Sequence, residues 1–413
     1  MGTPETLMAL PPRVVAFGGG HGLAASLSAL RRVTDDVTAI VTVADNGGSS
    51  GRLREELGAL PPGDLRMALA ALCGDDEWGT TWAGVVQHRF GGDGDLAGHS
   101  LGNLLIAGLW DLLGDPVAGL DWVGRLLRVT GRVLPMAAVP MDIVACVEGL
   151  DPALPAAVAT VRGQAAVAVT PGRVRSISLL PADPPAVPEA VTAVLEADWV
   201  VFGPGSWFTS VLPHLLVPSL RSALTATSAR KLVALNLMAQ PGETEGFSPH
   251  RHLEVLADHA PSLSFDVVLA DAGAVSGAEE ELRKAAALLR ASLTLADVAA
   301  PDGTRHDPVR LAAAFRQVFR AESLRSSCLR QPEDKAPGRR KTPPRRKRSG
   351  DGGVPRKETV QKTRVTPQLS SARGGPDKIA VFAIRPVPRG HRGVRGVAPP
   401  EDNRVMGVLS RWR

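Results

Sequence analysis

The apolar positions of this chain fall into short β-branched runs that alternate with longer, helix-like stretches. Two of these runs, residues 13–17 and 37–43, are apolar throughout, as strands buried on both faces of a parallel sheet usually are. A glycine-rich loop and then a helix-like segment follow each run. The pattern predicts an α/β fold, in which a Rossmann-like, mostly parallel sheet has helices on both faces.

The same alternation continues along most of the chain. Further elements are expected as strands at residues 198–202, 231–235 and 265–270, and as helices at residues 52–57, 64–72, 99–113, 278–289 and 311–319. Asp64 is placed to cap the helix at 64–72. Residues 129–180 instead carry short β-like runs between Gly and Pro, at 143–147, 165–169 and 174–180. We expect this stretch to form a small antiparallel excursion from the main sheet.

The composition changes near residue 325. Residues 325–413 hold 23 of the 47 Lys and Arg residues and 7 of the 42 Asp and Glu residues, a net charge of +16. The remainder carries −11 and does not have the composition of a nucleic-acid binder. We therefore divide the chain into a lead-in (1–12), a main domain (13–324, with the β-rich excursion at 129–180) and a basic, Pro-rich tail (325–413) that we expect to be disordered.

Three interpretations of the tail stay open. Its cluster Arg345-Arg346-Lys347-Arg348 could bind nucleic acid or anionic lipid. The tail could also be an extension without function, or the product of an altered reading frame.

Two features bear on the compartment of the protein. The apolar runs are interrupted well before about 18 residues, so we expect no membrane span, and we expect no secretory leader. The three cysteines are widely spaced, which argues against a disulfide framework or a zinc knuckle. We expect a cytoplasmic protein.

Two glycine loops carry the first candidate chemistry. They contain Gly18, Gly19, Gly20, His21 and Gly22, and then Asp45, Asn46, Gly47, Gly48, Ser49, Ser50 and Gly51. Glycine turns between a strand and a helix aim backbone N–H groups at one edge of a sheet, where phosphates bind. The alternatives are a tight turn without ligand, a second loop in which Asp45 and Ser50 only cap a helix, and a loose dinucleotide pattern with Asp45 on a ribose.

Further polar loops follow other predicted strands and helix starts. They contribute Asp64, Arg66, His99, Ser100, Asn103, Gly203, Pro204, Gly205, Ser206 and Asn236. In isolation, Asp64 and Arg66 could be only a local ion pair at a helix start. The chain has no Gly-Lys-Ser/Thr phosphate loop, no His/Cys metal cluster and no recognisable nucleophile–His–acid set. Any chemistry is therefore expected to involve phosphate groups and a metal ion. A nicotinamide-dependent dehydrogenase is a third interpretation, after a ligand-binding regulator and a transferase.

Taken together, these motifs resemble the YvcK family of bacterial gluconeogenesis factors, in the superfamily of the phospholactate transferase CofD. The resemblance spans roughly residues 13–320 and rests on Gly18-Gly19-Gly20-His21-Gly22, residues 41–54, residues 60–66, residues 97–104, Gly203-Pro204-Gly205-Ser206 and residues 236–244. It implies a Rossmann-like fold, a site for UDP-N-acetylglucosamine, and a cytoplasmic role in carbon metabolism, cell-wall (peptidoglycan) precursor supply and cell shape.

On this resemblance we expect a ligand-binding regulator whose pocket is formed by the loops at 18–22, 45–51, 99–103 and 203–206. Gly19, Gly20, Gly22 and Gly205 would offer N–H groups to a diphosphate, and Asp45 and Asn236 would bind hydroxyls or the base. The regulated protein partner is not identified, and a homo-oligomer is left open.

The enzyme alternative is a CofD-like transfer of a phospholactyl or phosphoenolpyruvyl group, with Asp45 and Asp64 holding Mg²⁺. No other cofactor is expected. The chain differs from the family's common pattern at His21, where Thr is usual, and at Asn46, where a second acid is usual. A neutral amide is a poorer partner for Mg²⁺ than a carboxylate.

Overall fold

A parallel sheet organises the part of the chain that the computed structural model describes, residues 11–240 and 242–329 (side chains to 322). Within these residues the sheet has seven strands, in the order β10-β9-β8-β7-β1-β2-β3. β1 and β7 pair with each other at the middle of the sheet. β2 and β3 follow on the β1 side, and β8, β9 and β10 follow on the β7 side. The strand order therefore reverses between β1 and β7, the position where open α/β sheets bind ligands at their carboxyl edge.

The strands predicted from apolar runs are present. They are β1 (Val14–Gly18), β2 (Val37–Val41), β7 (Trp199–Phe202), β8 (Arg230–Ala234) and β9 (Val267–Asp271). β1, β7 and β9 are buried at every position, which explains why their sequences do not alternate. The pattern missed β3 (Arg132–Pro135) and β10 (Ser292–Ala296). Both lie at the sheet edges: β10 is buried at none of its positions, and β3, although buried at three of its four residues, is too short to give a clear apolar run.

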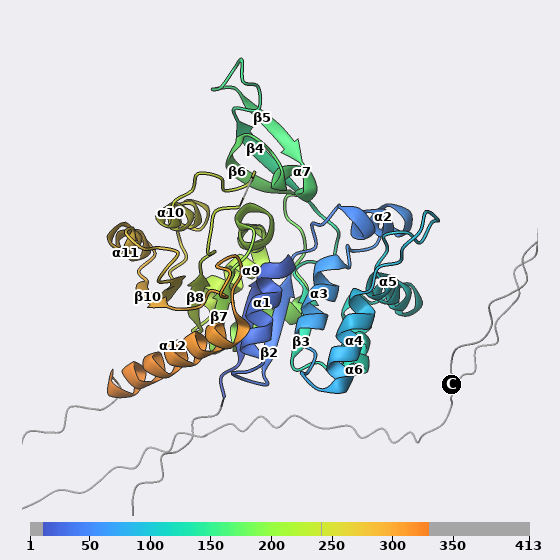
Figure 1. Cartoon of the computed structure of the whole chain (residues 1–413), viewed down its shortest axis with the longest axis horizontal. Helices are drawn as coiled ribbons and strands as arrows, with labels where there is room; N and C mark the ends of the chain where they lie inside the picture. Colours follow the sequence, from blue (N-terminus) through green and yellow to red (C-terminus); the bar gives the residue numbers. More distant parts are fainter. Residues whose placement is uncertain (1–10, 241, 330–413) are drawn as a thin grey trace, which may run out of the picture. The chain divides into compact units, whose positions relative to one another are not determined.

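Helices cover both faces of the sheet (Figure 1). On one face α1 (Gly20–Leu30) packs against α3 (Gly63–Ala71) and α12 (Pro308–Leu329). On the other, α8 (Pro188–Glu196) packs against α9 (Pro218–Ala226). The remaining helices are α2 (Gly48–Leu57), α4 (Glu77–Gln87), α5 (Leu101–Leu113), α6 (Pro116–Leu127), α10 (Pro249–His259) and α11 (Glu279–Leu288).

Residues 129–180 do contain an antiparallel sheet, of three strands within the described residues, in the order β5-β4-β6. β4 (Asp142–Glu148) and β6 (Arg173–Leu180) match the prediction, and the exposed β5 (Val158–Arg162) was missed. The β-like run at 165–169 was wrong, because it forms α7 (Gln164–Ala168). Gly163, with φ +96°, turns the chain there, and the Asn46 side chain accepts a hydrogen bond from the Ala165 N–H at 3.0 Å. A short apolar run does not by itself distinguish helix from strand.

Two predictions concern the ends of the chain. α12 runs to Leu329, beyond residue 319 where the periodicity suggested an end. The remainder of the predicted tail, residues 330–413, and the lead-in up to residue 10 lie outside the described residues. Among the residues that the structure does describe, none of the helices combines the length and the apolar character needed to cross a membrane.

Candidate functional site

A cavity of about 590 Å³ opens at the carboxyl edge of the sheet, beside β1, β7 and β8. Nine of the predicted site residues line it: Gly19, Gly20, His21, Gly22, Asp64, Pro204, Gly205, Ser206 and Asn236. Its volume falls within the range of small-molecule sites, about 300–1,000 Å³. The strand-order reversal and the cavity therefore coincide.

The first glycine loop forms the start of α1 on one side of this cavity. Gly19 precedes the helix in an extended conformation, and the Leu23 N–H donates to the Gly19 carbonyl at 3.3 Å. The N–H groups before Leu23 therefore lack acceptors within the helix, and a helix start with such groups favours an anion. The Gly20 N–H already bonds to Asp64, and the roles expected for Gly19 and Gly22 toward a diphosphate stay predictions.

The loop at residues 203–206 lies directly against α1. A Cβ added at Gly22 would stand 2.3 Å from the Pro204 carbonyl oxygen and 2.5 Å from the Gly205 Cα. The Ser26 hydroxyl donates to the Gly203 carbonyl at 2.7 Å. Only glycine at position 22 permits this approach, so the two loops, far apart in sequence, form one wall.

Asn236 holds the tip of this second loop. Its side-chain oxygen accepts from the Gly205 N–H and its side-chain NH₂ donates to the Gly205 carbonyl, both at 2.8 Å. The Gly205 N–H, expected for a diphosphate, is therefore already paired. Asn236 acts here on the loop backbone rather than presenting a free amide to a ligand.

Asp64 lies under the first glycine loop. A Cβ at Gly19 would approach its Oδ2 to 2.4 Å, and this oxygen is buried without a hydrogen-bond partner among the described residues. Burial first, and then the nearby charge of Asp45, raises the pKa of Asp64 to about 7, although a Gly20 backbone hydrogen bond and Arg66 oppose the shift. The expectation that Asp64 caps α3 was wrong, because Pro62 holds the cap position and Asp64 makes no capping bond.

The second glycine loop mostly bonds to the protein itself. Asp45 accepts from the Gly47 N–H at 2.9 Å, and the Ser50 hydroxyl accepts from the Gly63 N–H at 3.0 Å. A Cβ at Gly63 would lie 3.1 Å from Asp45 Oδ2. The loop thus fixes the start of α3, which carries Asp64, but it does not line the cavity.

Ser49, His99 and Asn103 form a buried polar group behind this loop. The Ser49 hydroxyl lies 3.0 Å from His99 Nδ1 and accepts from the Asn103 NH₂ at 3.0 Å. Burial, and then the charge of Arg52, lowers the pKa of His99, which favours the neutral ring. These side chains bond to one another and do not line the cavity, and the Asn103 Oδ1 is buried without a partner among the described residues.

Arg66 and Ser100 also lie outside the cavity. Arg66 is buried and donates to Gln87, and burial together with Arg89 lowers its pKa to about 10. Arg66 Nε and the Ser100 hydroxyl have no partner among the described residues. In full, the predicted residues that do not line the cavity are Gly18, Asp45, Asn46, Gly47, Ser49, Ser50, Arg66, His99, Ser100, Asn103 and Gly203.

The cavity also has walls that sequence reasoning missed. Thr304, Arg305 and His306, in the loop between β10 and α12, line it together with Gln164 and Ala168 of α7. Residues 237–240 and Glu243, which belong to the 236–244 motif, line it as well. Arg305 is 80% exposed and contacts Asp302 at 3.6 Å, so it can offer a cation to a bound anion. Recognition of β10 as a strand would have directed attention to the loop that follows it.

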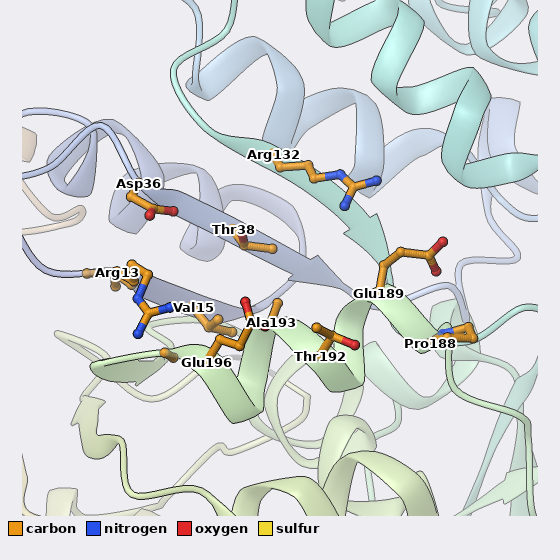
Figure 2. A pocket seen from close by; sticks show the side chains of 12 residues that line it. Arg13, Val15, Asp36, Thr38, Arg132, Pro188, Glu189, Thr192, Ala193 and Glu196 are labelled. Carbon is orange, nitrogen blue, oxygen red and sulfur yellow. The ribbon is translucent and has the colours of Figure 1, made fainter. Parts of the chain in front are cut away.

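Another hollow, of about 390 Å³, lies at the opposite, amino edge of the sheet (Figure 2). Its labelled residues come from β1, β2, β3 and α8, and from the positions just before β1 and β2, where Arg13 and Asp36 lie. They include the carboxylates Glu189 and Glu196. Its two arginines already pair with carboxylates, Arg13 with Asp198 and Arg132 with Asp121. No predicted loop reaches this hollow, so it is not the candidate site.

The residues near Asp64 also fit a divalent cation in part. Asp64 Oδ2 is buried without a partner, and Asp45 is close enough to raise its pKa. Mg²⁺ is usually held by one or two carboxylates together with substrate phosphates and water. Asp45 and Asp64 could supply such a pair, although no group of three or more His, Cys, Asp or Glu suited to a metal occurs in the described part of the chain.

Comparison with known proteins agrees with this fold. The family described as 2-phospho-L-lactate transferase CofD matches residues 14–302. A Mycobacterium tuberculosis (strain ATCC 25618 / H37Rv) protein, which bears the name gluconeogenesis factor with a provisional qualifier, is 59% identical over 307 residues, 74% of this chain and 90% of its own. The gluconeogenesis factor of Bacillus subtilis (strain 168) is 38% identical over 262 residues, 63% of this chain and 79% of its own.

A solved structure gives the same result. The crystal structure of a UPF0052 family member from Bacillus halodurans has a TM-score of 0.65 and 33% identity, covering 74% of this chain and 99% of that one. The chain belongs to the CofD family of Rossmann-like α/β proteins. Within that family it is a member of the YvcK, or UPF0052, group, whose members are named gluconeogenesis factors.

Proposed function

We propose that this protein is a cytoplasmic regulator that binds a nucleoside diphosphate sugar, UDP-N-acetylglucosamine, in the cavity at the carboxyl edge of the sheet. The observation that carries the proposal is the contact between the start of α1 and the loop at residues 203–206, because both line one ligand-sized space beside a helix start. Binding would report the supply of cell-wall precursor to a partner protein.

The electrostatics of the cavity support an anionic ligand. The helix start carries a partial positive charge, and Arg305 adds a full one. The one carboxylate beneath the glycine loop, Asp64, has a pKa near 7, so near neutral pH a substantial fraction of it is uncharged. At the glycine loop a diphosphate can therefore approach without meeting a fully ionised Asp64, and the other lining carboxylate, Glu243, is bonded to three donors of its own.

A matched pair of glycine substitutions tests the site. Gly22→Ala places a methyl group against the Pro204 carbonyl and should lower the affinity for UDP-N-acetylglucosamine about tenfold or more, measured by calorimetry. Gly84→Ala, in α4 with nothing within 4 Å of the added methyl, should leave the affinity unchanged. The proposal would be refuted if the unsubstituted protein did not bind UDP-N-acetylglucosamine, or if Gly22→Ala and Gly84→Ala bound it with equal affinity.

The second candidate is the Mg²⁺-dependent transferase implied by the CofD family. The buried, unpartnered Asp64 Oδ2 beside Asp45 favours it, because a cation there would satisfy that oxygen. When bound, Mg²⁺ would neutralise charge on the donor phosphates. Incubation with a guanylyl phospholactate donor, a deazaflavin acceptor and Mg²⁺ decides between the candidates: turnover that disappears in Asp64→Asn would establish the enzyme and overturn the regulator.

A further inference from the structure

Glu243 is a buried carboxylate, 5% exposed, that lines the cavity, and the sequence motifs assigned it no role. One carboxylate oxygen, Oε1, accepts from the backbone N–H groups of Phe208, at 2.5 Å, and Thr209, at 2.9 Å. The other, Oε2, accepts from the Ser206 hydroxyl. A single side chain therefore binds three donors of one turn.

These donors stand at the start of the short helical segment Trp207–Val211. The first N–H groups of a helical turn need an acceptor, and an ionised carboxylate is a strong one. Burial raises the pKa of Glu243, whereas the three donors oppose this shift. The carboxylate and the N–H groups of the turn thus stabilise each other, because each would cost free energy if it were buried without a hydrogen-bond partner.

The turn held by Glu243 also forms part of the cavity. Ser206, Thr209 and Ser210 all line it. The preceding residue of the same segment, Gly205, is held by Asn236. Both Asn236 and Glu243 come from the loop after β8, so this loop fixes the segment 205–209 at two points through side chains.

We propose that Glu243 is a positioning residue, which sets the Ser206–Thr209 turn in the conformation that receives the ligand. This inference rests on the proposed binding function of the cavity. Glu243 acts as a built-in anion at the start of the helical segment, and the ligand binds to the surface that this contact shapes. Its effect on affinity is exerted through Ser206 and Thr209.

The chain offers a matched control in Glu245. It lies two residues away, is exposed, and lines a neighbouring cavity of about 540 Å³ that Glu243 also borders, but not the ligand cavity. Glu243→Ala leaves two buried N–H groups without an acceptor, so the affinity for UDP-N-acetylglucosamine should fall about tenfold or more. Glu245→Ala should stay within about twofold of the unsubstituted protein, and Glu243→Gln, which keeps one acceptor, should fall between them.

Calorimetry should be done well below the melting temperature of each variant, so that all the protein is folded. A lower melting temperature with unchanged affinity would reduce Glu243 to a purely structural residue and overturn the proposal. A higher affinity in Glu243→Ala would also overturn it, since Glu243 would then compete with the ligand. Non-additive effects of Ser206→Ala and Glu243→Gln on affinity would support action through Ser206.

Hydrogen exchange gives a readout that needs no ligand. The amides of Phe208 and Thr209 should exchange faster in Glu243→Ala than in the unsubstituted protein, and at the original rate in Glu245→Ala. If the protein does not bind the nucleotide sugar at all, the proposed function fails while this exchange result still shows whether Glu243 holds the turn. Unchanged exchange in Glu243→Ala would refute the positioning role independently.

Discussion

Replacement of Asp64 by Asn tests the electrostatics of the candidate site most directly. Asp64 is buried against Gly19 and Gly20 and has a charged neighbour in Asp45. Asn has nearly the same shape and keeps an oxygen that can accept the Gly20 hydrogen bond, but it carries no charge at any pH. The substitution therefore removes the cost of ionising Asp64 inside the protein and changes little else.

The size of that cost follows from the pKa of Asp64, which rises from 3.8 to about 7 on folding. A shift of about three units corresponds to about 4 kcal/mol. Below pH 3.8 the carboxyl is protonated in both the folded and unfolded states, so its favourable contribution is complete. This contribution is lost as the pH rises from 3.8 to 7, because over this range the unfolded chain ionises while the folded one stays protonated.

The assay is urea unfolding of both proteins at pH 5 and pH 8. At pH 8, Asp64→Asn should have the larger free energy of unfolding, by up to about 4 kcal/mol, and at pH 5 the difference should be smaller by about 2.5 kcal/mol. Asp93→Asn, at an exposed loop position, should change the free energy by less than about 0.5 kcal/mol at either pH. A difference between the unsubstituted protein and the Asp64→Asn variant that does not vary with pH would refute the reasoning.

Three further outcomes follow from buried polar groups. Burial lowers the pKa of His214 from 6.5 to about 4, so its contribution to stability is complete above pH 6.5 and is lost as the pH falls toward 4. In urea unfolding, the free energy of unfolding of His214→Leu should therefore fall by about 3 kcal/mol less than that of the unsubstituted protein over this pH range. Ser49→Ala leaves Asn103 and His99 without their shared partner and should cost about 1–3 kcal/mol of stability with unchanged ligand affinity, by thermal unfolding and calorimetry. Asn236→Ala frees the Gly205 loop and should weaken binding of UDP-N-acetylglucosamine more than it lowers the melting temperature; the opposite order would show that the loop is held by other contacts.

Much of the architecture could be predicted from local pattern alone. Strands such as β1 and β9 are buried on both faces, so their runs of apolar residues are conspicuous in the sequence. The edge strands β3 and β10 have no such signal, and α7 was predicted as β because five apolar or small residues fit either conformation.

The candidate site, like the fold, could be predicted only in part from the sequence. The glycines of the first loop and Asp64 could be assigned because a strand, a glycine turn and a helix have a known joint geometry. Nothing local distinguished Asp64, which faces the cavity, from Ser49 or His99, which bond to each other behind it. Arg305 was missed because its loop follows an edge strand that the pattern did not reveal.

The sequence by itself determined the kind of protein: repeated strand–loop–helix units, with phosphate-binding turns at strand ends, can form only a limited set of sheets. Only the tertiary structure decided which polar groups face the ligand space. Whether a side chain such as Asn236 or Glu243 bonds to a neighbouring loop or to a ligand depends on contacts between segments separated by about 30 residues. Burial and hydrogen bonding between distant segments are set by packing, and local periodicity carries no information about them.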